Sequence, residues 1–209
     1  VVDNTVRSDA QFTPRLIALL EKSATVVIVS TLEEATAALC GEFDGAVLSG
    51  SARTFSRGVD SRVMRMNAKV LDTIGVPVLG VCFGMQVMAV HYGGRVEALP
   101  DEISGVHVIR TSPSVLFKDS REISTRSEHG DAVTHTPRGF RAVAWNGAGP
   151  QQSTVLAAME NTRRRLCGFQ FPPEAPPAHP QGGLRFLAVR RTAPLVPARR
   201  PPVPHVRHW

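Results

Sequence analysis

The N-terminal half of the chain alternates between amphipathic segments and short apolar runs. Apolar residues at helical spacing predict helices over residues 13–22, 31–40, 59–74 and 84–92. Apolar runs too short for helices predict buried strands over residues 25–30, 45–49 and 76–81. Strands separated by helices of this length indicate a parallel sheet with helices on both faces.

Two of the predicted helices begin with recognisable signals. Thr13 precedes Pro14, a favoured pair for the N-cap and the first helical position. Thr31 and Glu34 have the spacing of a capping box, in which each side chain accepts a hydrogen bond from the backbone of the other residue. We therefore expect helices to start at these two positions.

The pattern changes after Gly94, where short strand-like runs replace the helices. They predict strands over residues 106–111, 140–145, 154–159 and 166–171. We expect these strands to form an antiparallel extension at one edge of the sheet. The predicted fold is an α/β domain with an open, mostly parallel sheet, helices on both faces and this antiparallel edge.

The C-terminal end differs in composition from the rest of the chain. Ten of the sixteen prolines follow Phe171, and five arginines but no acidic residue follow Val189. Because proline removes a backbone donor and fixes φ, we predict a folded domain over residues 1–191 and an extended, largely disordered tail over 192–209. Divergence and a frameshift in the gene are alternative origins for this composition.

The charge distribution bears on possible partners. The formal net charge is +6, and the five arginines after Val189 account for nearly all of it. The nearly neutral body therefore lacks the basic surface of a nucleic-acid binder. No apolar run approaches the ~18 residues that a membrane span needs. The sequence thus argues against nucleic acid and membrane as partners.

A strand-to-helix turn carries the clearest chemical signal. Gly80-Val81-Cys82-Phe83-Gly84 has the form of a nucleophile elbow, in which flanking glycines permit a tight turn and the helix N-terminus favours a thiolate. Taken alone, the pattern also fits a buried cysteine packed between a strand and a helix. With Cys40 and Cys167 the chain has three cysteines, a sparse, odd number that indicates a reducing compartment and hence the cytoplasm.

Three motifs decide between these interpretations. They are G-V-P-V-L-G-V-C-F-G-M-Q at 75–86, E-H-G-D-A-V at 128–133 and G-F-Q-F-P-P-E at 168–174. Their order and spacing, over roughly residues 1–187, resemble those of the class I (triad) glutamine amidotransferases. Within this family the His-Gly-Asp run at 129–131 makes the chain most similar to the amidotransferase domains of GMP synthetases.

The resemblance implies a flavodoxin-like fold and a Cys-His-Glu mechanism. Cys82 would attack the side-chain amide of L-glutamine and release ammonia, and water would then cleave the glutamyl thioester. Glu174 would be the triad carboxylate. The other implied roles are an oxyanion hole at Phe83 and Ser51, glutamine binding at Gln86, Gly50 and His129, and contact with a partner domain at Gly130 and Asp131.

The resemblance also implies where the ammonia goes. It would pass to an ATP-pyrophosphatase (synthetase) domain or subunit, which would use it for GMP synthesis in purine biosynthesis. ATP and Mg would belong to that partner, and this domain would hold no cofactor and no metal of its own. The whole reaction would be that of a ligase, with hydrolysis of glutamine as the step performed here.

The chain departs from the family pattern at three positions. Pro172 stands in the place of the triad histidine, and a proline cannot accept or return a proton. Ser51 stands in place of a glycine at the oxyanion hole, and Glu128 in place of a serine beside the glutamine pocket. We therefore expect weak or absent turnover. His179 is a candidate replacement for the base.

Two alternatives to an active amidotransferase follow from these departures. One is a pseudoenzyme that binds glutamine or a partner protein without turnover, which Pro172 and Ser51 favour. The other is a different thiol hydrolase that shares the elbow, such as a gamma-glutamyl hydrolase. Gln86 and the two downstream motifs argue against the second.

Deletion of residues 192–209 should shift the melting temperature by no more than a few degrees, because a tail without a packed core adds little to stability. Thermal unfolding of the full-length and shortened chains measures this shift. A much larger loss would show that the tail docks onto the domain.

Overall fold

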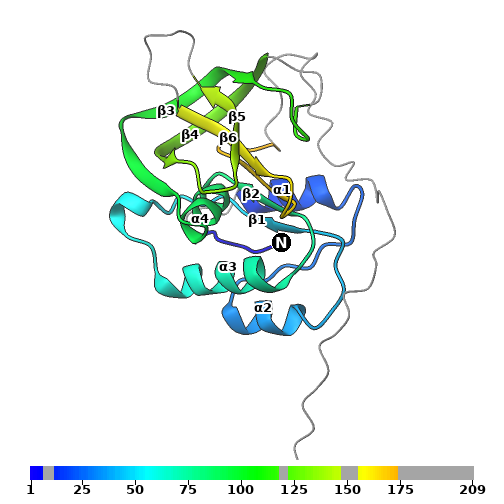
Figure 1. Cartoon of the computed structure of the whole chain (residues 1–209). Coiled ribbons are helices and arrows are strands. Elements are labelled where there is room, and N and C mark those ends of the chain that lie inside the picture. The colour runs from blue at the N-terminus through cyan, green and yellow to red at the C-terminus, as the bar shows by residue number, and fades with distance from the viewer. Residues whose placement is uncertain (7–11, 118–121, 147–154, 174–209) are drawn as a thin grey trace, which may run out of the picture.

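The computed structural model describes residues 1–6, 12–117, 122–146 and 155–173. They form one seven-stranded sheet with the strand order β1-β2-β7-β6-β5-β3-β4 (Figure 1). In that order, the strands are Ala46–Leu48, Val78–Val81, Leu166–Phe169, Val155–Asn161, Arg141–Asn146, Arg95–Thr111 and Glu122–His135. The predicted tail lies outside the described residues.

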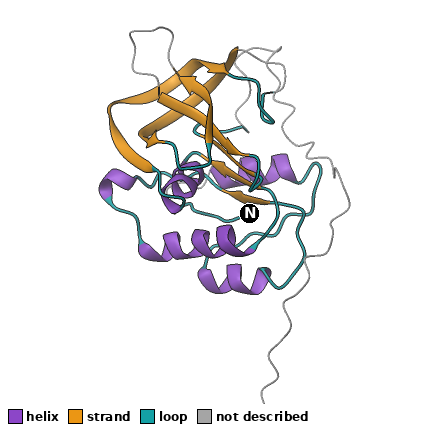
Figure 2. Ribbon diagram, viewed as in Figure 1, coloured by secondary structure: helices purple, strands orange, loops and turns teal. Residues whose placement is uncertain are grey.

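The end of the sheet formed by β1, β2 and β7 is parallel. The alternation of strands and helices predicts this for β1 and β2. The sequence pattern places the strand over 166–171 in the antiparallel extension, and that placement is wrong: β7 lies inside the sheet, parallel to β2 and antiparallel to β6. The helices of this end are α1 (Phe12–Leu20), α2 (Leu32–Ala38), α3 (Ser61–Thr73) and α4 (Phe83–His91), with a short 3-10 helix η2 (Phe55–Arg57). Neighbouring residues of β1 face opposite ways: Val47 packs with α1, whereas Leu48 packs with α2, α3 and α4. Helices thus cover both faces, and Figure 2 shows them gathered around this end of the molecule.

The remaining strands, β3 to β6, form an antiparallel extension at the edge, as predicted for 106–111, 140–145 and 154–159. Its main feature is the ribbon of β3 and β4, which pair from Arg95 to Arg110 and curl away from the parallel strands (Figure 1). The sequence predicted a short strand over 106–111 and none over β4. Along β4 the side chains do alternate between buried and exposed, but several buried ones are polar, so the hydrophobic pattern is missing. The predicted fold class is confirmed, with a longer antiparallel part than the pattern indicated.

The strand predicted over residues 25–30 is wrong. Val29 makes one isolated parallel bridge, and Val27 and Ile28 are 46% and 47% exposed. Val2, the second residue of the chain, takes the place beside β1: its backbone N–H donates to the Val47 carbonyl (2.7 Å), and it is 2% exposed. The apolar run at 25–30 therefore lies on the far side of residues 1–3 from β1. These three residues are too few to pair with it as a regular strand.

The two predicted helix starts have different outcomes. The capping box is confirmed: the Thr31 hydroxyl accepts from the Glu34 backbone (3.1 Å), and the Glu34 carboxylate accepts from the Thr31 backbone (3.2 Å). Thr13 is not an N-cap, because α1 already begins at Phe12 and the Thr13 hydroxyl donates to Asp3 instead (2.9 Å). None of the helices among the described residues is long and apolar enough to cross a membrane.

The first turn of α4 packs directly on the sheet through glycine. A Cβ on Gly84 would lie 2.2 Å from the Leu48 carbonyl oxygen, and a Cβ on Gly80 would lie 2.7 Å from Gly84 backbone atoms. Neither neighbour is the end of a flexible side chain. This close approach holds the start of α4 against β1 and β2.

We expect Gly84→Ala to lower the free energy of unfolding by about 3 kcal/mol, the upper part of the range for overpacking, because backbone must move to admit the methyl group. Chemical denaturation measures the change. Gly130→Ala is the matched control, since a Cβ there meets nothing within 4 Å. Equal stability of the two variants would contradict the close packing of α4.

Candidate active site

Cys82 forms the sharp turn between β2 and α4. Its backbone has φ 49° and ψ −109°, a conformation that L-residues rarely adopt and that costs roughly 1–3 kcal/mol. The Cys82 N–H donates to the Phe169 carbonyl of β7 (2.6 Å), and the Cys82 carbonyl accepts from the Gln86 N–H of α4 (3.1 Å). The predicted nucleophile elbow is thus present, and the side chain is half-buried at the carboxyl end of β2.

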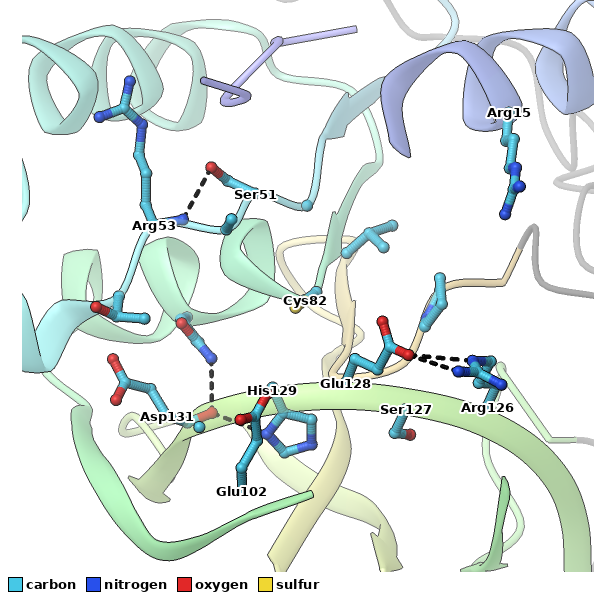
Figure 3. A pocket seen from close by; sticks show the side chains of 17 residues that line it. Arg15, Ser51, Arg53, Cys82, Glu102, Arg126, Ser127, Glu128, His129 and Asp131 are labelled. Atoms are coloured by element: carbon cyan, nitrogen blue, oxygen red, sulfur yellow. Dashed lines mark hydrogen bonds and ion pairs between the residues drawn. The ribbon is translucent and has the colours of Figure 1, made fainter. Parts of the chain in front are cut away.

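A cavity of about 330 Å³ opens beside Cys82 (Figure 3), within the usual size range for small-molecule sites. It is lined by α1, the segments after β1 and β7, the elbow, β3 and β4. Its lining residues are Arg15, Gly50, Ser51, Ala52, Arg53, Thr54, Val81, Cys82, Gln86, Glu102, Arg126, Ser127, Glu128, His129, Gly130, Asp131 and Pro172.

The cavity brings together most of the residues that the sequence singled out. The predicted members are Gly50, Ser51, Cys82, Gln86, Glu128, His129, Gly130, Asp131 and Pro172. Phe83 does not line it with its side chain, which is fully buried and stacks on Phe55; the role expected for Phe83 belongs to its backbone N–H. Glu174 and His179 lie outside the described residues.

The segment after β1 is held close to the elbow. A methyl group on Gly50 would lie 3.5 Å from Cys82 Cβ, so the two residues are neighbours. Ahead of it, the Ser49 hydroxyl accepts from the Asn4 N–H (2.9 Å), and the Asn4 side chain exchanges hydrogen bonds with Asn67. The Ser51 hydroxyl accepts from the Arg53 N–H (3.1 Å). This buried amide network fixes the loop that carries Gly50 and Ser51.

Asp131, predicted to contact a partner domain, is engaged within this domain. Its side chain is 3% exposed, and its carboxylate accepts from the Ser56 N–H (3.0 Å) of η2. Its backbone carbonyl accepts from Gln86 Nε2 (2.9 Å). Asp131 therefore connects β4 to both η2 and α4.

The protonation state of His129 follows from its surroundings. His129 Nδ1 lies 2.9 Å from the Asp131 carbonyl, which can only accept, so Nδ1 carries the hydrogen and Nε2 of the neutral ring has the free lone pair. Burial lowers the pKa of His129, against a smaller opposing effect of the bond to Asp131. The ring therefore remains neutral at neutral pH.

The rim of the cavity is charged on both sides. The Glu128 carboxylate accepts from Nη2 (2.7 Å) and Nε (3.2 Å) of Arg126, and both side chains are about half exposed. Arg15 and Glu102 complete the rim (Figure 3). The extra carboxylate expected at Glu128 thus lines the cavity, with its charge paired on the surface.

Gln170 is a site residue that the sequence pattern did not single out. Its Nε2 lies 3.6 Å from Cys82 Sγ, and its side chain is 2% exposed. The sequence contained one usable signal: Gln170 is a polar residue between two buried phenylalanines, at the end of the strand that lies beside β2. The contact between Gln170 and Cys82 depends on the strand order β2-β7, which the sequence pattern does not give.

Comparison with known proteins agrees with this geometry. The family model for class-I glutamine amidotransferases matches residues 4–187. The chain is 36% identical over 139 residues to a GMP synthase [glutamine-hydrolyzing] of Nitrosomonas eutropha, covering 62% of this chain and 25% of that protein. It is also 36% identical over 146 residues to the Vibrio vulnificus (strain YJ016) enzyme of the same name, covering 69% and 26%. The chain thus spans about a quarter of the length of these relatives.

Solved structures support the fold. A Thermoplasma acidophilum protein named as a GMP synthase subunit superimposes with a TM-score of 0.69 at 23% identity, over 82% of this chain and 83% of that one. A glutamine amidotransferase of Thermotoga maritima gives 0.62 at 17% identity, over 83% and 75%. With a nucleophile elbow, a cavity beside it and a family match over most of its length, the chain belongs to the class-I glutamine amidotransferase family.

Proposed function

We propose that this domain binds L-glutamine in the cavity beside Cys82 and hydrolyses it slowly. One observation carries the proposal: the cavity that holds the elbow cysteine is lined by Pro172 where the family pattern has an imidazole. Cys82, the proposed nucleophile, lines this cavity, and the residue that would carry its proton in the family pattern is replaced by a proline, which has no titratable side chain.

The proposed reaction uses the thiolate of Cys82. Its sulfur forms a bond to the side-chain carbonyl carbon of glutamine, the C–N bond breaks, and ammonia leaves with a proton taken from water. A second water then cleaves the thioester to glutamate and restores the thiolate. The backbone N–H of Phe83 and the loop at Ser51 are the proposed oxyanion donors. Solvent must accept the thiol proton, because Pro172 cannot.

We further propose that the ammonia serves a synthetase partner in GMP formation. The named relatives are GMP synthases, and this chain corresponds to about a quarter of their length. The partner would be an ATP-pyrophosphatase domain or subunit that binds ATP and Mg. We also propose a cytoplasmic location, because three cysteines are a sparse, odd number.

A second candidate is a glutamine-binding module without turnover. Pro172 favours it, because loss of one triad member typically lowers the rate by ~10⁴ or more. Binding does not require the missing imidazole, since Gly50 and the polar side chains of β4 line the cavity independently of it. The two candidates differ in ammonia release and agree in glutamine binding.

We expect the unmodified chain to release ammonia from glutamine very slowly, and Pro172→His to raise the rate at least tenfold because general acid–base catalysis contributes ~10²–10⁴. A coupled assay for ammonia measures both rates. Cys82→Ala is the control and should abolish release in both backgrounds. If Ser51 is the larger defect, adding Ser51→Gly to Pro172→His should raise the rate further.

Fast, Cys82-dependent release by the unmodified chain would contradict slow turnover and require another base. His129 lines the cavity with a neutral ring, and His179 follows the last motif. Loss of the release in His129→Asn or in His179→Ala would identify which one acts. Absence of release together with measurable glutamine binding would leave the binding module as the function.

A further inference from the structure

We propose that the side-chain amide of Gln170 donates a hydrogen bond to the sulfur of Cys82 and stabilises the thiolate. This inference rests on the proposed use of Cys82 as the nucleophile. It assigns to a neutral amide part of the electrostatic role that an imidazolium would have at position 172.

The position of Gln170 makes such contact direct. Gln170 follows β7, the strand that pairs with β2, and its backbone N–H donates to the Ala157 carbonyl (2.9 Å). Its Nε2 lies 3.6 Å from Cys82 Sγ, a normal length for a hydrogen bond to sulfur. The side chain is 2% exposed, so water competes little for the amide.

Hydrogen bonding fixes which end of the Gln170 amide faces the sulfur. The chain of bonds begins at the Asp131 backbone carbonyl, which can only accept. Gln86 therefore presents its amide nitrogen to that carbonyl (2.9 Å), and the same nitrogen lies 3.3 Å from Gln170 Oε1. Gln170 must then present oxygen to Gln86 and nitrogen to Cys82.

The reverse orientation is disfavoured. Turning the Gln170 amide by 180° would set its nitrogen against the Gln86 nitrogen, so that two donors would meet inside the protein. Both side chains are 2% exposed, and buried donors without acceptors are costly. The relay from Asp131 through Gln86 thus aims a donor at Sγ.

A donor at this place favours the charged form of the thiol. A neutral thiol is a weak acceptor, whereas a thiolate accepts a charge-assisted hydrogen bond of about twice the strength. The proton that leaves Sγ goes to solvent through the cavity. The other charged or titratable groups that line this cavity are Arg15, Arg53, Glu102, Arg126, Glu128, His129 and Asp131.

The test is the pH dependence of Cys82 alkylation by iodoacetamide, followed by mass spectrometry of the peptide that contains Cys82. We expect Gln170→Met, which keeps the side-chain length and removes the donor, to raise the midpoint by about one pH unit, a tenfold loss of thiolate near neutral pH. Gln170→Glu should raise it as well, because a carboxylate repels the thiolate. All other charged groups of the cavity are unchanged in Gln170→Met.

Two internal controls accompany each measurement. Cys40 is exposed and remote from the relay, so its alkylation profile should be the same in every variant. Cys167 should stay unmodified, because burial, with the nearby Glu160 adding to it, raises its pKa to about 12. Gln86→Met should raise the Cys82 midpoint by less than Gln170→Met, since it removes the orienting partner and leaves the donor.

An unchanged or lower midpoint in folded Gln170→Met would overturn the proposal. If that variant does not fold, Gln170→Leu, which is also neutral and lacks the donor, gives the same decision. Alkylation needs neither glutamine nor turnover, so its outcome is separate from that of the ammonia assay. A raised midpoint with no ammonia release in any variant would support the role of Gln170 and count against hydrolysis.

Discussion

The elbow end of this domain depends on holding one L-residue, Cys82, in a backbone conformation that it disfavours. The cost of roughly 1–3 kcal/mol is offset by contacts on both sides of the turn. The Cys82 N–H donates to the Phe169 carbonyl at 2.6 Å, which joins the turn to β7. Gly84 lies beneath the Leu48 carbonyl, where even a methyl group would collide, so α4 cannot drift from the sheet. These same contacts bring the thiol beside both Gly50 and Gln170. The strain and the site therefore have one structural cause.

The cavity has a second organising point in the backbone carbonyl of Asp131. It accepts from Gln86 and from His129, and the carboxylate of the same residue accepts from Ser56. A single residue of β4 thereby fixes the orientation of one amide, the tautomer of one imidazole and the position of η2. Buried polar networks of this kind are stabilising while every member is satisfied and costly when one is lost. Gln86, expected to bind glutamine, uses its amide nitrogen to donate to the Asp131 carbonyl and to Gln170 Oε1. A side chain with an amide nitrogen at this length is therefore needed at position 86 to complete the network.

The sequence predicted the parts of the molecule that have strong local patterns. The elbow at Cys82, the capping box at Thr31 and the parallel strands all follow from spacing that depends on a few neighbouring residues. The failures have a different origin. The run at 25–30 has the local pattern of a buried strand, but Val2, far away in sequence, occupies the place beside β1. The strand β4 was missed because its buried side chains are polar, and their partners are supplied by α4 and η2. Gln170 is not indicated by local periodicity either, because its contact with Cys82 depends on β7 lying beside β2, whereas the sequence pattern places that strand in the antiparallel extension.

A thiol nucleophile has two separate requirements, a negative charge on sulfur and a carrier for its proton. The first is met by groups that need not titrate: the helix N-terminus behind Cys82 and an amide aimed at its sulfur. The second requires a group whose pKa lies near the working pH and which can return the proton to leaving ammonia. Pro172 removes the second and leaves the first intact, because the relay through Asp131, Gln86 and Gln170 does not pass through it. Stabilisation of negative charge on the Cys82 sulfur is thus built separately from the group that would carry its proton. Under the proposed function, a proline at position 172 therefore slows proton transfer, while the rest of the cavity beside Cys82 is lined by other residues.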